Sequence, residues 1–218
     1  MSLDIISALR FLSLEDHSYF DCVVVCILSH GTESSVVGPD GISVDIKQLT
    51  DIFSNENCPT LANKPKLFFL QMLEQEEKLK RGGNKRPSPH GAAPPEDLAM
   101  APHKEQLEKL VPEDADFLLT FALIPQSAIN SATPADSHRS VYHYYVGVLF
   151  GMMEKYARKL NLLDVMTTVH SEIRRIRLTN HAVTDPSGIG APLQVTPRIQ
   201  STLKYNLYLS AHGVGSAK

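Results

Sequence analysis

The stretch that decides the fold is a run of seven consecutive apolar residues, Cys22-Val23-Val24-Val25-Cys26-Ile27-Leu28. Most of these residues are β-branched or Cys, and none of them provides a polar face. Such a run predicts a strand buried on both sides, as in a parallel sheet covered by helices. The segment Ser29-His30-Gly31 ends this strand, and Gly38-Pro39-Asp40-Gly41 further on predicts turns.

A second buried strand, Lys66-Leu67-Phe68-Phe69-Leu70, follows an amphipathic helix predicted over 45–54. Strand, helix and strand in this order form a βαβ unit, so the predicted fold class is α/β. A third buried strand is predicted over 116–124. Further helices are predicted over 3–14, 141–160 and 162–178, and an alternating, half-exposed strand over 199–209.

The middle of the chain breaks this pattern. Residues 74–112 are rich in charge and then in proline, with five prolines between Arg86 and Pro102. A long segment without a secondary-structure pattern is unusual inside a domain, so we interpret it as an exposed linker that divides the chain into two halves.

Composition narrows the possible functions. The chain has 218 residues, 43% of them apolar and 21% charged, which is typical of globular proteins. With 21 basic and 24 acidic residues it lacks the charge of a nucleic-acid binder, and no apolar run approaches a membrane span. The start predicts no signal peptide, and three cysteines predict reduced thiols in a cytoplasmic protein. No pattern predicts a metal site or a cofactor.

Five blocks, in order along the chain, resemble the caspase family, nearest its initiator type: residues 21–31, 38–41, 58–71, 112–118 and 197–209. The resemblance implies a mostly parallel, caspase-like sheet flanked by helices and short of the family's N-terminal strands. It also implies a partial large-subunit-like region (1–73), an intersubunit linker (74–112), a small-subunit-like region (113–210) and a tail (211–218). A sheet without a central strand would expose a strand edge and favour pairing with another chain.

By this resemblance, His30 is the catalytic histidine and Gly31 contributes to the oxyanion hole. The family's second strand ends in Q-A-C-x-G, whereas this chain has Gln71-Met72-Leu73-Glu74-Gln75. Leu73 therefore stands at the position of the cysteine nucleophile and Gln75 at that of the glycine. Losing the nucleophile of such an enzyme costs about 10⁶ in kcat. Without the family context, His30 reads as a strand-end histidine with no catalytic task.

The substrate pocket departs from the family as well. The arginine of the S-x-R-N-P motif matches Ala132 in Asn130-Ser131-Ala132-Thr133-Pro134, and Arg139 is a displaced alternative. We expect Cys22 and Cys26 to lie inside a buried strand and Cys58 on a loop. None of the three is expected at the end of the nucleophile strand. Ser127 and Ser131 are other hydroxyl groups that could be considered as nucleophiles, but no sequence pattern indicates a general base beside either of them. In the linker, Asp97 is either a processing site or an ordinary loop acid.

Three functions are open at this point: a caspase-like pseudoenzyme that pairs with an active caspase, an Asp-specific cysteine endopeptidase, and a truncated product without function. For the first, the expected partner is a caspase, as hetero- or homodimer, with no role for nucleic acid, membrane or metal. The last strand is its expected dimer surface, unless that face packs on the chain's own helices; the residues are Ile199, Leu203, Tyr205, Leu207 and Leu209.

Overall fold

The computed structural model describes residues 2–74, 109–112, 116–125, 144–179 and 195–209. Its strands are β1 (Val23–Gly31), β2 (Ser35–Val37), β3 (Ser43–Asp45), β4 (Lys66–Glu74), β5 (Phe117–Ile124) and β6 (Thr196–Ser201). Its helices are α1 (Ser2–Ser13), α2 (Ile46–Asp51), the short 3₁₀ helix η1 (Pro59–Leu61), α5 (Tyr144–Tyr156) and α6 (Leu162–Thr179).

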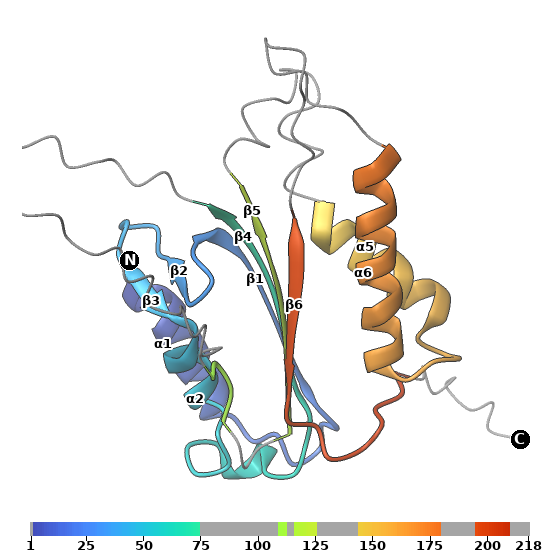
Figure 1. Ribbon diagram of the computed structural model, residues 1–218. Helices are drawn as coiled ribbons and strands as arrows, with labels where there is room; N and C mark the ends of the chain where they lie inside the picture. The colour runs from blue at the N-terminus through green and yellow to red at the C-terminus, as the bar shows by residue number, and fades with distance from the viewer. Residues whose placement is uncertain (1, 75–108, 113–115, 126–143, 180–194, 210–218) are drawn as a thin grey trace, which may run out of the picture.

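The described strands form one mixed sheet in the order β3-β2-β1-β4-β5-β6. The central strands β1, β4 and β5 are parallel, while β2, β3 and β6 join the sheet in antiparallel orientation. Figure 1 shows α1 and α2 on one face of the sheet and α5 and α6 on the other. The predicted α/β class, with its βαβ unit from β1 through α2 to β4, is confirmed.

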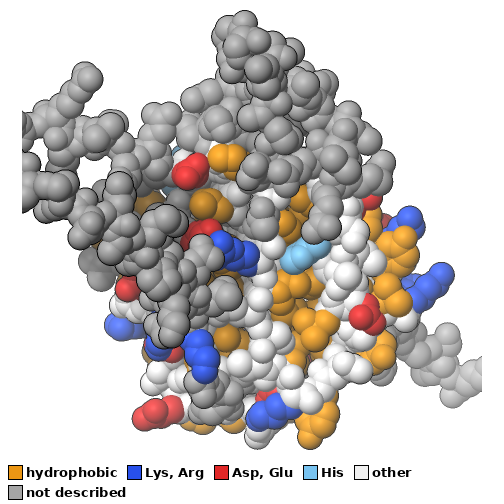
Figure 2. Space-filling view, viewed as in Figure 1, with side chains coloured by type: hydrophobic (Ala, Val, Ile, Leu, Met, Phe, Trp, Pro, Cys, Tyr) orange, Lys and Arg blue, Asp and Glu red, His pale blue; other side chains and the backbone are white. Residues whose placement is uncertain are grey.

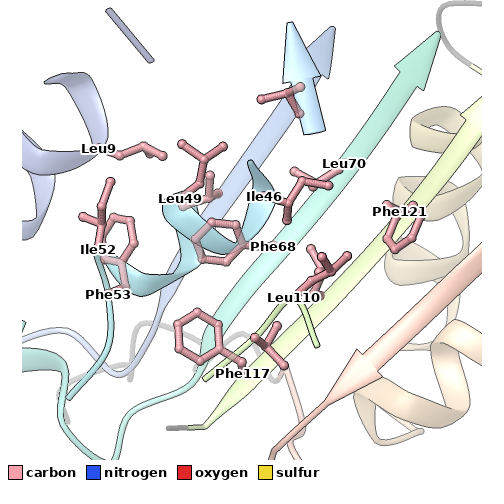
Figure 3. Close-up of a cluster of buried hydrophobic side chains, with 14 of the residues drawn as sticks. Leu9, Ile46, Leu49, Ile52, Phe53, Phe68, Leu70, Leu110, Phe117 and Phe121 are labelled. Atoms are coloured by element: carbon pink, nitrogen blue, oxygen red, sulfur yellow. The ribbon is translucent and has the colours of Figure 1, made fainter. Parts of the chain in front are cut away.

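Strand β4 holds the two faces together because its side chains alternate between them. Phe68, Leu70 and Met72 point into a core shared with α1 and α2, part of which Figure 3 shows. Leu67, Phe69 and Leu73 point into a second core, shared with α5 and α6. All of these side chains are buried, so β4 is the doubly covered strand that its unbroken apolar sequence predicted.

The prediction that residues 22–28 are buried on both sides is wrong. Along β1, Val23 and Val25 are buried, whereas Val24, Cys26 and Leu28 are exposed. Cys22 precedes the strand and is half-buried. The exposed side chains lie on the face opposite the α1–α2 core, and none of them belongs to the buried cluster that β4 shares with α5 and α6. Whether the second face of β1 is buried depends on which other elements pack against it, and the apolar sequence of the strand does not determine this.

The last predicted strand is also shorter than expected. Strand β6 ends at Ser201, and residues 202–209 continue as irregular chain. The alternation of apolar residues persists there because the segment lies against α6: the Leu162 N–H donates to the Leu207 carbonyl at 2.7 Å. The side chains of Leu203, Leu207 and Leu209 are half-buried against the α5–α6 core.

The segment after β1 contains a hairpin that the sequence pattern did not predict. Strands β2 and β3 are each three residues long, too short for a periodicity to be seen. The predicted turn between them is present: the Gly41 N–H donates to the Gly38 carbonyl at 2.9 Å, and Gly41 has a φ of 80°. A positive φ favours glycine at that position.

Candidate functional site

The site that the resemblance indicates lies at the carboxyl ends of β1 and β4. In the parallel register His30 is paired with Leu73, and Gly31 with Glu74. Paired residues on neighbouring strands point to the same face, and the strands lie about 4.8 Å apart. The structure therefore brings together the two positions matched to the family's histidine and cysteine, with His30 exposed and Leu73 only 3% exposed.

The environment of Leu73 suits a hydrocarbon side chain. It belongs to the buried cluster that includes Tyr145 and Leu149 of α5. A leucine here has no atom that can attack a carbonyl or exchange a proton, so the pair can supply an imidazole and nothing for it to activate.

Gly31 has a structural role that is independent of any oxyanion. A Cβ on this residue would lie 2.3 Å from the Ser35 carbonyl oxygen and 3.2 Å from the Met72 sulfur. The close approach of β2 to the end of β1 therefore requires glycine at this position. Beside it, the Ser29 hydroxyl donates to the Val37 carbonyl at 2.6 Å and further fixes this approach.

Gln71 is a structural residue whose contacts the sequence pattern did not show. Its Oε1 accepts the backbone N–H groups of Tyr145 at 3.2 Å and Val146 at 3.1 Å, the first turn of α5. The amides at a helix start have no partner within the helix, so this side chain stabilises the start of α5. The sequence feature that could have revealed this role is the position of Gln71 as a polar residue between apolar residues of β4. Gln71 is 2% exposed, so its Oε1 forms these hydrogen bonds in the interior, away from solvent.

Tyr145 extends the same buried polar group. Its hydroxyl is hydrogen-bonded to the Thr120 hydroxyl on β5. Burial raises the pKa of the Tyr145 phenol well above its ordinary value, although the hydrogen bond to Thr120 acts in the opposite direction. Tyr145 therefore stays protonated at physiological pH and serves to tie α5 to the sheet.

All three cysteines are described, and none lies beside His30. Cys26 is on the same face of β1 as His30 but four residues earlier, which places it about 13 Å away along the strand. Proton transfer needs a heavy-atom distance of about 3 Å. Both thiols are partly shielded from water by the surrounding protein, and this desolvation raises the pKa of Cys26 and of Cys22, so neither is activated as a thiolate. The prediction that both lie inside a buried strand is wrong, since Cys26 is exposed.

Cys58 belongs to a separate buried group. Its Sγ lies 3.2 Å from the Ser13 carbonyl and 4.0 Å from Nδ1 of His17. The same ring nitrogen is 3.2 Å from the Thr60 hydroxyl. Cys58 is fully buried, so this thiol is inaccessible to a peptide and joins α1 to the segment before β4.

Several predicted positions lie outside the described residues: Asp97, Ala132, Arg139, Ser127 and Ser131, together with most of the linker and the tail.

The predicted dimer surface is divided between two environments. Ile199, Leu203, Leu207 and Leu209 are half-buried on the α5–α6 core, whereas Tyr205 is 85% exposed. Figure 2 shows hydrophobic side chains gathered on the side of the molecule where β6 and α6 lie nearest the viewer.

Other binding features are few in the described ranges. A groove of about 610 Å³ lies between α1 and α2, lined by side chains that include Arg10, Lys47 and Asp51, away from His30. Lys47 and Asp51 form an ion pair at 2.9 Å. Among the described residues there is no group of three potential metal ligands, and none of the helices is long and apolar enough to cross a membrane.

With this geometry in place, comparison with known proteins identifies the class. The family model of the caspase domain (Peptidase_C14) matches residues 2–208, so the chain belongs to the caspase-domain family.

Among curated relatives, the chain is 30% identical over 167 residues to Caspase-2 of Gallus gallus, covering 76% of this chain and 38% of that one. It is 30% identical over 159 residues to Caspase-8 of Rattus norvegicus (73% and 31%) and 31% identical over 182 residues to Caspase-3 of Xenopus laevis (83% and 57%). The chain thus spans about one third to three fifths of these relatives.

The solved structure titled "structure of pro-sf-caspase-1" is similar to this chain, with a TM-score of 0.65 and 24% sequence identity. The superposed region covers 95% of this chain and 71% of the caspase-1 chain. This likeness supports the caspase fold described above.

Proposed function

We propose that this chain is a caspase-family pseudoenzyme that pairs with an active caspase and changes the activation of that caspase in apoptotic or innate immune signalling. The observation that carries the proposal is Leu73, a buried leucine directly opposite His30 on the neighbouring strand. A cysteine peptidase needs a thiolate within proton-transfer distance of an imidazole. The chain's three thiols all lie elsewhere in the fold.

The proposed pairing surface is the edge strand β6 with the segment that follows it. In the described part of the chain β6 has a strand neighbour, β5, on one side only. An unpaired edge can bind another strand, and the exposed Tyr205 provides an aromatic contact next to it. The half-buried leucines after β6 contribute mainly to the chain's own core. We place the pairing in the cytoplasm, where caspase partners would be reduced and accessible.

The pairing can be tested by co-purification with individual caspases, followed by measurement of the partner's rate on a peptide ending in Asp. We expect a caspase to bind and its rate to change. A Tyr205→Lys variant should lose binding, whereas Ile42→Lys, at an exposed position of the β2–β3 turn, should keep it.

Two outcomes would end this proposal. One is turnover of the peptide by the chain alone, which would favour the hypothesis that the chain is an Asp-specific cysteine endopeptidase. The other is the absence of a cooperative thermal transition both alone and with a caspase, which would favour a truncated product without function.

A further inference from the structure

The segment that follows β6 is fixed at both of its ends, and the exposed Tyr205 lies between them. At one end, the Thr202 N–H donates to the Phe117 carbonyl at 2.9 Å, and the Thr202 hydroxyl accepts the Phe117 N–H at 3.1 Å. At the other end, the Leu162 N–H donates to the Leu207 carbonyl at 2.7 Å. Figure 1 shows this segment running from β6 toward the start of α6. Both ends are attached to the core of the fold, because Phe117 and Leu162 are buried.

Asp116 provides a further attachment directly before Tyr205. Its Oδ1 accepts the backbone N–H of Lys204 at 3.1 Å, and its Oδ2 lies 3.5 Å from Nζ of the same lysine. The backbone carbonyl of Asp116 accepts the Lys66 N–H at 2.8 Å, so Asp116 is itself held on β4. Asp116 is 6% exposed, and a buried carboxylate is costly unless it is paired and hydrogen-bonded. The contact with Lys204 therefore serves both the carboxylate and the segment that it holds.

Of the two contacts that Asp116 makes with Lys204, the one with the backbone is the stronger. A hydrogen bond from an amide to a carboxylate is charge-assisted. The ion pair is long and the lysine side chain is 47% exposed, so the ammonium contributes little. Asp116 thus determines the course of the chain at Lys204 rather than the place of the lysine head group.

Tyr205 is the side chain that gains from this order. It is 85% exposed, and a tyrosine offers a large contact area with only two rotatable side-chain bonds. Much of the entropy that it loses on binding therefore belongs to the backbone that carries it. Fixing that backbone in the free chain removes a cost that binding would otherwise have to meet.

We propose that Asp116 is a positioning residue for the pairing surface: its carboxylate holds the segment before Tyr205 in the conformation in which this tyrosine meets the partner caspase. The inference rests on the pairing proposed above. It adds that the surface is preformed in the free chain, and that an acid 88 positions earlier in the sequence controls its affinity.

Hydrogen exchange of the free chain tests the positioning without any partner. Asp116→Ala should speed exchange of the Lys204 amide by at least about tenfold, because the acceptor of this amide is removed. Asp116→Asn keeps an acceptor oxygen and should have a smaller effect. Lys204→Met removes the ammonium but not the backbone N–H, and it should have almost none.

Two references accompany these variants. Asp45→Ala is the matched control, because Asp45 is exposed and its side chain makes no capping hydrogen bond to α2; it should leave the Lys204 amide unchanged. The amide of Phe69, in the centre of β4, should exchange at the parent's rate in every variant, which shows that the fold as a whole is intact.

Affinity for a caspase that co-purifies with the chain tests the consequence for pairing. Asp116→Ala should raise the Kd about tenfold, and Asp45→Ala should leave it unchanged. Tyr205→Ala should raise the Kd about a hundredfold, as expected of an aromatic anchor in an interface. Because Asp116 acts through Tyr205, adding Asp116→Ala to Tyr205→Ala should raise the Kd by less than about a further twofold.

Two results would overturn the inference. One is an unchanged exchange rate of the Lys204 amide in Asp116→Ala. The other is a tenfold effect of Asp116→Ala that persists in the Tyr205→Ala background, since Asp116 would then act on the fold and not on Tyr205. Absence of caspase binding by the parent chain would instead end the proposed pairing, and the exchange rates alone would decide whether Asp116 holds the segment.

Discussion

Gln71 supports a quantitative test of how α5 is held on the sheet. The perturbation is Gln71→Met, which keeps the length of the side chain and removes the acceptor of two backbone N–H groups at 3.2 and 3.1 Å. A neutral hydrogen bond contributes about 1 kcal/mol net, and a buried donor left without a partner costs about 1–3 kcal/mol. The two donors together predict a loss of about 2–6 kcal/mol in the free energy of unfolding.

The assay is urea unfolding followed by circular dichroism, with the denaturant slope compared between variants. Gln48→Met is the matched control because Gln48 is exposed on α2, and it should change stability by less than about 0.5 kcal/mol. If Gln71→Met is as stable as the control, α5 does not depend on this side chain and our account of the polar group at its start is incorrect.

Three further predictions concern the same region. Gly31→Ala should destabilise the chain by about 1–3 kcal/mol in urea unfolding, because the new methyl group would meet the Ser35 carbonyl. The free energy of unfolding should fall as the pH rises above 10, because the unfolded state then releases the Tyr145 proton that the folded state retains. The slope of the free energy of unfolding against pH is at most about 1.4 kcal/mol per pH unit and should be smaller in Tyr145→Phe. Leu73→Cys should restore little hydrolysis of a peptide ending in Asp, because Gln75 and Ala132 still depart from the family pattern. Its control is Leu67→Cys, which is also buried on β4 but lies far from His30, and turnover by Leu73→Cys near that of a working caspase would refute the argument.

Sequence reasoning identified the parallel centre of the sheet because β4 and β5 are covered on both faces, and such strands have unbroken apolar sequences. The same pattern misled at β1. Its apolar run resembles that of β4, but one face is exposed, and exposure is a property of the surrounding structure.

The residues after β6 show a second limit. Alternating apolar side chains indicate a surface that is half-buried, and residues 202–209 are half-buried without being a strand. For the site, motif matching placed His30 and Leu73 on successive strands, while the register that makes them neighbours is a three-dimensional property. The contacts of Gln71 with α5 join residues more than seventy positions apart, beyond the reach of any local pattern.

The central proposal is that Leu73 leaves His30 without a nucleophile to activate, since none of the three thiols of this caspase-family chain lies beside it. The most direct measurement is hydrolysis of a fluorogenic peptide ending in Asp by the unmodified chain, with the chain in excess over the peptide, beside a His30→Ala variant. The account predicts that both chains release no more fluorophore than buffer does. Release by the unmodified chain that disappears in His30→Ala would contradict it.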